Sequence, residues 1–195
     1  MKEKIAENWW KNAEQNDKNR YTGLYRNLKF KINYPVLEIG GGNGSFLDYQ
    51  NIKSAIIIDV AGKESIKNAE YKFITADITK KLPKLDKKFK TIFLMEVLEH
   101  IKNPLYLGAQ VYDLLDNDGI CYISIPYTLL DINREKQKNK FNCHVCRWSK
   151  KEIVDQMNKL GFKTRVIQQR RRFKNTAFYL PHCWLILELK KRLNH

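Results

Sequence analysis

The residues best suited to chemistry lie between positions 36 and 46, which read VLEIGGGNGSF. An acid, Glu38, interrupts a short apolar run, and four glycines follow it within five residues. A glycine-rich turn after a buried strand lets backbone N–H groups approach a bound nucleotide closely. The stretch therefore predicts a nucleotide-type ligand, and its spacing can indicate which kind.

The spacing of these glycines argues against two common nucleotide loops. A P-loop would continue with Gly-Lys-Ser/Thr, and no lysine follows here. A dinucleotide fingerprint needs G-x-G-x-x-G, but Ser45 stands at its third glycine and the order found is Gly40-x-Gly42-x-Gly44. Glu38 also needs a partner if its strand is buried. A cationic group of the ligand, such as the amino group of an amino acid, would supply that partner.

The elements that must position this loop alternate between strands and helices. We predict strands at 36–39, 54–60, 71–75, 90–96 and 119–125, the last stopped by Pro126, and a closing hairpin at 162–168 and 176–180. Helices are predicted over 45–49, 104–115 and 149–160, after a helical lead-in over 1–33. The pattern predicts an α/β fold, a Rossmann-like doubly wound sheet of about seven strands with the last antiparallel and helices on both faces. We expect a single domain over 1–195, with its core at 34–195.

Several motifs at ordered intervals carry a family resemblance. The E-x-G-x-G-x-G of 38–44 resembles motif I of the class I S-adenosylmethionine-dependent methyltransferases, and IIID at 56–59 and ADI at 76–78 resemble the acids that follow the second and third strands. IFLMEVLEHIKNP at 92–104, LLDNDGICYISIPY at 114–127 and RWSKKEIVDQMNKLGF at 147–162 resemble later motifs of the small-molecule type. The resemblance covers about residues 34–168.

The resemblance implies a cofactor and a set of residues that hold it. The cofactor is S-adenosyl-L-methionine, and the product is S-adenosyl-L-homocysteine. Asp59 would bind the ribose hydroxyls, as acids do in dinucleotide sites, and Asp77 would accept from the adenine amino group. The full set of predicted cofactor contacts is Glu38, Gly40, Gly42, Asn43, Gly44, Asp59, Val60, Asp77, Ile78 and Glu96.

Methyl transfer requires an acceptor held in line with the electrophilic methyl group, and a hydroxyl acceptor is helped by a base. His144 and His100 are the leading candidates for that base, with Glu96 and Glu99 as further polar groups near strand ends. Glu96-x-x-Glu99-His100, together with His144-x-x-x-Trp148, also resembles the metal site of small-RNA 3′-terminal 2′-O-methyltransferases. The surrounding sequence fits the metal-free small-molecule group better, so no metal is expected.

A zinc site is a further alternative that the cysteines raise. Cys143 and Cys146 have the CxxC spacing, and His182-Cys183 could supply two more ligands. The adjacent second pair is not a standard zinc spacing. We therefore do not expect zinc, and the four cysteines of the chain do not indicate a disulfide framework.

The formal charge of +15 points to an anionic partner. Residues 161–195 carry nine basic residues against one acid, a net +8, and include Arg170, Arg171 and Arg172. These arginines should lie near the turn between the last two strands, beside the acceptor pocket. With Tyr127, they are the predicted substrate residues. Two alternatives stay open. The lysines could reflect the overall composition of the chain, and the arginines could form an exposed basic hairpin that binds no substrate.

The sequence thus predicts an S-adenosylmethionine-dependent methyltransferase that methylates oxygen on a small-molecule or glycan acceptor bearing phosphate or carboxylate. One alternative is an RNA 3′-terminal 2′-O-methyltransferase with a metal at Glu96, Glu99, His100 and His144. Another is a cofactor-binding subunit without catalysis. Apolar runs far shorter than a membrane span and the lack of a secretory signal predict a cytoplasmic protein.

Overall fold

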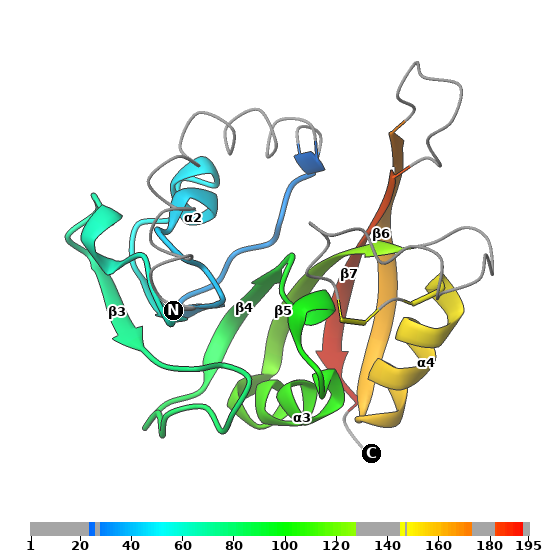
Figure 1. The fold of residues 1–195 in the computed structure, drawn as a ribbon. Helices are drawn as coiled ribbons and strands as arrows, with labels where there is room; N and C mark the ends of the chain where they lie inside the picture. The colour runs from blue at the N-terminus through cyan, green and yellow to red at the C-terminus, as the bar shows by residue number, and fades with distance from the viewer. Residues whose placement is uncertain (1–23, 26–27, 128–144, 147, 173–181, 193–195) are drawn as a thin grey trace.

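The computed structural model describes residues 24–25, 28–127, 145–146, 148–172 and 182–192, and shows one sheet with helices against it (Figure 1). The strands are β1 (Val36–Ile39), β2 (Ala55–Asp59), β3 (Tyr71–Thr75), β4 (Phe89–Met95), β5 (Leu115–Tyr127), β6 (Phe162–Arg172) and β7 (His182–Lys191). The helices are α2 (Ser45–Tyr49), α3 (Pro104–Leu114) and α4 (Lys150–Lys159), with short 3₁₀ turns η1 (Lys63–Ser65) and η2 (Leu98–His100). None of the described helices is long and apolar enough to cross a membrane.

The sheet has seven strands in the order β3-β2-β1-β4-β5-β7-β6. Neighbours from β3 to β5 run parallel, while β7 runs antiparallel to both β5 and β6. The carboxyl ends of β1 to β5 and of β6 therefore meet at one edge of the sheet, where ligands bind in open α/β folds. The predicted doubly wound sheet with an antiparallel final strand is confirmed.

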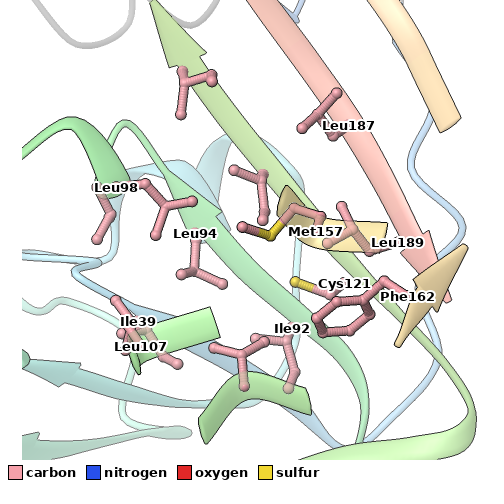
Figure 2. Packing of buried hydrophobic residues seen from close by; sticks show 14 of the residues in the cluster. Ile39, Ile92, Leu94, Leu98, Leu107, Cys121, Met157, Phe162, Leu187 and Leu189 are labelled. Carbon is pink, nitrogen blue, oxygen red and sulfur yellow. The ribbon is translucent and has the colours of Figure 1, made fainter. Parts of the chain in front are cut away.

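Successive residues of the central strands point to opposite faces, and each face has its own core. On one face the strands pack against α3 and α4, as Figure 2 shows around Leu107 and Met157. On the other face α2 and the segment before β1 cover the sheet with aromatic rings. Phe46 of α2 meets Phe93 of β4 edge-on with ring centroids 5.1 Å apart, and Phe93 stacks on Tyr122 of β5 at 5.6 Å. Helical cover on both faces is the predicted arrangement.

Local sequence signals account for where the two long helices begin. Pro104 occupies the first turn of α3, and the side chain of Asn103 accepts from the Tyr106 N–H. At α4 the hydroxyl of Ser149 accepts from the Glu152 N–H, while the Glu152 carboxylate accepts from the Ser149 N–H. This reciprocal capping box satisfies two backbone donors that the first turn would otherwise leave without partners.

Two boundary predictions were wrong. The predicted helix over 1–33 does not extend through residues 28–33, which are not helical, and Leu24–Tyr25 is its only described helical part. The fifth strand does not stop at Pro126 but continues to Tyr127, because its pairing with β4 ends at Ser124 and no ladder donor is needed beyond it on that side. The closing strand is β7 at His182–Lys191; the predicted strand at 176–180 lies outside the described residues.

Candidate cofactor site and acceptor edge

The glycine loop leaves β1 and is tied to the end of β2 by backbone and carboxylate contacts. The Gly40 N–H donates to the Ile58 carbonyl at 2.8 Å, and the Gly42 N–H donates to Asp59 Oδ2 at 2.9 Å. Asp59 Oδ1 also accepts from the N–H groups of Val60 at 2.6 Å and Ala61 at 3.4 Å. Burial raises the pKa of Asp59, and these backbone donors oppose the rise. In this structure Asp59 therefore fixes the shape of the loop.

Glu38 lies beneath the same loop, almost entirely out of water. Its residue is 2% exposed, and its Oε2 has no hydrogen-bond partner among the described residues. A Cβ added at Gly41 would lie 2.4 Å from that oxygen, so any side chain at position 41 would force the carboxylate to move. Burial raises the pKa of Glu38 well above its ordinary value, and the negative charges of Asp59 and Asp48 raise it further. A buried carboxyl oxygen with no partner fits the amino group of a ligand.

The other predicted cofactor residues line the same edge at different depths. Asn43 is buried, and its Oδ1 accepts from the backbone N–H of Ser45 at 3.1 Å. Ile78 packs against the loop, since its Cδ1 would lie 3.4 Å from a Cβ at Gly40. Asp77 is more exposed and accepts from the N–H and hydroxyl of Thr79, which lower its pKa. The structure thus brings these residues to one edge, and their contacts with the cofactor stay a prediction.

Glu96 directly follows β4, in the middle of this edge, and has an unusual backbone conformation. Its φ is 59°, in the left-handed region that residues other than glycine seldom adopt. Its carboxylate is held by two donors, the Ser124 hydroxyl to Oε1 at 2.8 Å and Trp184 Nε1 to Oε2 at 2.9 Å. Sequence reasoning named Glu96 but missed Ser124 and Trp184. The signal for Ser124 was a hydroxyl inside the apolar run GICYISI, where a buried polar group needs a partner.

Of the two candidate bases, the structure describes His100 but not His144. His100 is exposed in η2, and its Nε2 is 3.8 Å from Oε1 of the buried Glu99. His144 lies outside the described residues, but the backbone N–H groups of Val145 and Cys146 donate to the Glu99 carbonyl at 2.7 and 3.0 Å. The segment directly after His144 therefore contacts η2. The role of either histidine as a base stays a prediction.

The predicted substrate residues lie at the same edge as the glycine loop. Tyr127 ends β5 and is in register with Cys183. Arg170, Arg171 and Arg172 end β6, in register with Trp184, Cys183 and His182. The backbone thus places the three arginines at the end of the sixth strand, next to the segment that leads to β7. Their contact with a substrate stays a prediction.

No metal site is found among the described residues, which contain no group of three or more His, Cys, Asp or Glu side chains able to hold an ion. The side chains of Cys143, His144, His182 and Cys183 are not among the described ones. In the described part, both oxygens of Glu96 accept from protein donors and Glu99 is 1% exposed. Glu96, Glu99 and His100 thus do not form such a group among the described residues, and the metal alternative stays a prediction.

The sheet order and the glycine loop define an α/β protein that binds a nucleotide-type cofactor at the carboxyl edge of its parallel strands. The model of a methyltransferase domain matches residues 2–168, most of the chain. The chain belongs to this methyltransferase-domain family, and it is a class I S-adenosylmethionine-dependent methyltransferase by family and fold. Its cofactor is S-adenosylmethionine.

The chain is similar in sequence to a curated relative and similar in fold to a solved structure. An uncharacterized protein of Methanocaldococcus jannaschii is 34% identical over 133 residues, which is 65% of this chain and 63% of that protein. The matched part thus spans less than two thirds of the relative. A Haloferax volcanii protein, solved in complex with the Trm112 methyltransferase activator, has a TM-score of 0.73 at 15% identity and covers 96% of this chain and 98% of its own.

Two further solved structures share the fold. DhpI, solved as a DhpI-SAM-HEP complex, has a TM-score of 0.66 at 14% identity, with coverage of 96% of this chain and 94% of its own. The small RNA methyltransferase HEN1 has a TM-score of 0.61 at 16% identity and covers 93% of this chain but 25% of its own. At such identities the likeness concerns the fold, and the acceptor must be argued from this chain's own residues.

Proposed function

We propose that this methyltransferase transfers the methyl group of S-adenosylmethionine to an oxygen of a small-molecule or glycan acceptor that carries a phosphate or carboxylate. The observation that supports this most is the position of Arg170, Arg171 and Arg172, at the end of β6 on the same sheet edge as the glycine loop. Guanidinium groups bind carboxylate and phosphate oxygens in pairs, which orients an acceptor as well as attracting it.

Different residues would bind the different parts of the cofactor and the acceptor. The glycine loop and Glu38 hold the amino-acid part of the cofactor, Asp59 and Asp77 its ribose and adenine, and the arginines with Tyr127 the acceptor. The cofactor itself supplies an electrophilic methyl group. Because the group is already reactive, the protein's contribution is to align it with the acceptor and to exclude water. His100 or His144 would accept the proton of an acceptor hydroxyl.

A matched pair of triple variants tests the role of the arginines. Arg170→Ala, Arg171→Ala and Arg172→Ala together should lower methyl transfer from labelled S-adenosylmethionine to a panel of sugar phosphates at least tenfold, mainly through KM. The control replaces three exposed lysines at the opposite edge of the sheet, Lys53, Lys159 and Lys163. It removes the same charge but no residue of the proposed site. Equal loss in both triple variants would reject a local role for the arginines.

A second candidate is methylation of an RNA 3′ end. It is favoured by the contact of Val145 and Cys146 with Glu99, which brings the segment after His144 to η2, and by the fold likeness to the small RNA methyltransferase. Methyl transfer to a short RNA that requires manganese, with retention on RNA that falls steeply with salt, would favour this candidate. Transfer that is unaffected by a chelator would reject the metal.

The third candidate is a cofactor-binding subunit that serves a partner protein. The Haloferax volcanii structure, a complex with a methyltransferase activator, motivates it. Calorimetry with S-adenosylmethionine tests the cofactor binding that all three candidates require. No binding to the isolated chain at millimolar cofactor would reject both enzyme proposals for the chain alone, whereas micromolar binding would leave the partner unnecessary for cofactor capture.

A further inference from the structure

The carboxylate of Glu96 is fixed by residues from two distant segments. Its own backbone N–H donates to the carbonyl and to the hydroxyl oxygen of Ser124, both at 3.0 Å. The Ser124 hydroxyl donates back to Oε1, and Trp184 Nε1 donates to Oε2. Both oxygens thus accept, and the left-handed φ of 59° is the backbone conformation that accompanies this arrangement.

Ser124 connects this carboxylate to the N-terminal part of the chain. The Tyr25 hydroxyl is 2.8 Å from Ser124 Oγ, and both residues are buried. A serine hydroxyl offers one donor and two acceptor positions. Since Ser124 donates to Glu96 Oε1 and accepts from the Glu96 N–H, Tyr25 must be the donor in their bond. Ser124 therefore uses all of its hydrogen-bonding capacity, and it cannot turn away from Glu96 without losing several bonds at once.

The residue after Glu96 contacts the glycine loop, which is the proposed cofactor site. Val97, the residue after Glu96, packs on the loop so closely that a Cβ at Gly40 would be 2.5 Å from its Cγ2. Glu96 itself is only partly buried, at the carboxyl edge between β1 and β5. With the adenine at the ends of β2 and β3, as proposed above, a negative charge at Glu96 would face the other end of the cofactor, on the acceptor side.

We propose that Ser124 and Trp184 are positioning residues for Glu96, and that its fixed carboxylate makes the site prefer the cationic sulfonium of S-adenosylmethionine over the neutral thioether of S-adenosylhomocysteine. The inference rests on the proposed placement of the cofactor in the glycine loop. The two ligands differ by one methyl group and one positive charge. A carboxylate held in place by protein donors attracts the charged donor and gains nothing from the neutral product, so product release is favoured.

The test measures the ratio of two dissociation constants by calorimetry, with S-adenosylmethionine and S-adenosylhomocysteine as the probes. In Glu96→Gln the preference for the sulfonium should fall about tenfold relative to the unmodified protein, as expected for one partly screened charge pair. Trp184→Phe removes one donor and should lower the preference about threefold, and Ser124→Ala should do the same or more. A general loss of fold would weaken both ligands alike, so the ratio isolates the charge.

Two controls separate this effect from packing. Trp148→Phe removes an indole whose Nε1 donates to Gln156 Oε1 instead, at 3.1 Å, and should leave the ratio unchanged. Sinefungin, which carries an amine in place of the methylated sulfur, should follow S-adenosylmethionine in every variant. If Glu96→Gln and Trp184→Phe bind both ligands with the ratio of the unmodified protein, the inference is wrong while the cofactor site stands. If the unmodified protein binds neither ligand, both fail.

Discussion

Glu38 and Glu96 lie at the carboxyl ends of adjacent strands, β1 and β4, yet their carboxyl groups differ in hydrogen bonding. Glu96 receives a hydroxyl and an indole N–H, one for each oxygen. Glu38 is buried under the glycine loop with one oxygen that no described residue contacts by a hydrogen bond. The protein supplies a donor for each oxygen of Glu96, whereas one oxygen of Glu38 has no partner among the described residues.

The difference is informative because an unpartnered buried carboxyl group lowers the stability of the folded chain. Such a group is retained where a ligand supplies the missing partner, and burial raises the pKa of Glu38 well above its ordinary value. Glu96 needs no ligand to hold its position, so it can act as a fixed charge from the outset. We therefore expect substitutions at Glu38 to change how tightly the cofactor binds. Substitutions around Glu96 should instead change the preference for S-adenosylmethionine over S-adenosylhomocysteine.

The largest effect is expected for Glu38→Gln. The amide keeps the size of the side chain but cannot pair with a cationic amino group, so the affinity for S-adenosylmethionine should fall roughly 100-fold, a change of about 2.7 kcal/mol. Calorimetry measures it directly. The control is Glu70→Gln, an exposed acid at the opposite edge of the sheet, which should leave binding unchanged. A loss below threefold at Glu38 would mean that the amino group is bound elsewhere.

The sequence predicted the loop, its strand and its acids because these features are local. Glu38, Gly40 and Asp59 stand at fixed offsets from strands whose apolar runs are easily found. The partners of Glu96 could not be found in the same way, because Ser124 and Trp184 are 28 and 88 residues away and meet it only through the order of the sheet. Nothing local in a sequence specifies such a contact.

The boundaries that failed have physical reasons of the same kind. Pro126 usually ends a strand, but here the neighbouring strand β4 stops first, so the proline breaks no ladder on that side. Apolar residues at helical spacing before position 33 predicted a helix, yet Asn33 bonds by its backbone N–H to the Thr91 hydroxyl of β4 at 2.9 Å. Tertiary contacts decided the conformation in both places.

The close passage of the loop over Glu38 gives the second prediction. Gly41→Ala would place a methyl group 2.4 Å from Glu38 Oε2, so the carboxyl group must move and the cofactor affinity should fall about tenfold. In a Glu38→Ala background the same methyl group has room, and its extra cost should be below twofold. Additive losses in this double-mutant cycle, measured by calorimetry, would show that Gly41 acts independently of Glu38.

The third prediction concerns stability without ligand. The pKa of Glu38 is raised in the folded chain, so the unfolded chain loses this proton at a lower pH than the folded chain does. The free energy of unfolding therefore falls as the pH rises from the unfolded pKa to the folded pKa. Glu38→Gln should therefore raise the melting temperature of the ligand-free protein at neutral pH, by on the order of 5 °C. The gain should disappear below the ordinary value of 4.5, where both states are protonated. A gain that is equal at pH 4 and pH 8 would point to packing instead.

The smallest effect is expected away from both carboxyl groups. Ser149→Ala removes the capping box of α4 and should destabilise the protein by about 1 kcal/mol, or about 2–4 °C, by thermal unfolding. The affinity for S-adenosylmethionine should not change, because α4 packs on the sheet away from the loop (Figure 1). A matching loss of affinity would indicate that global stability, rather than local contacts at Glu38, governs binding in all of these variants.

The most direct measurement is a crystal structure of the complex with S-adenosylhomocysteine. We predict that the ligand's amino group lies within about 3 Å of Glu38 Oε2, a normal hydrogen-bond distance, while the sulfur lies on the side of the glycine loop nearer Glu96. An amino group held only by other residues, with Glu38 Oε2 still buried and unpaired beside the bound ligand, would contradict the central claim that this carboxyl group anchors the cofactor.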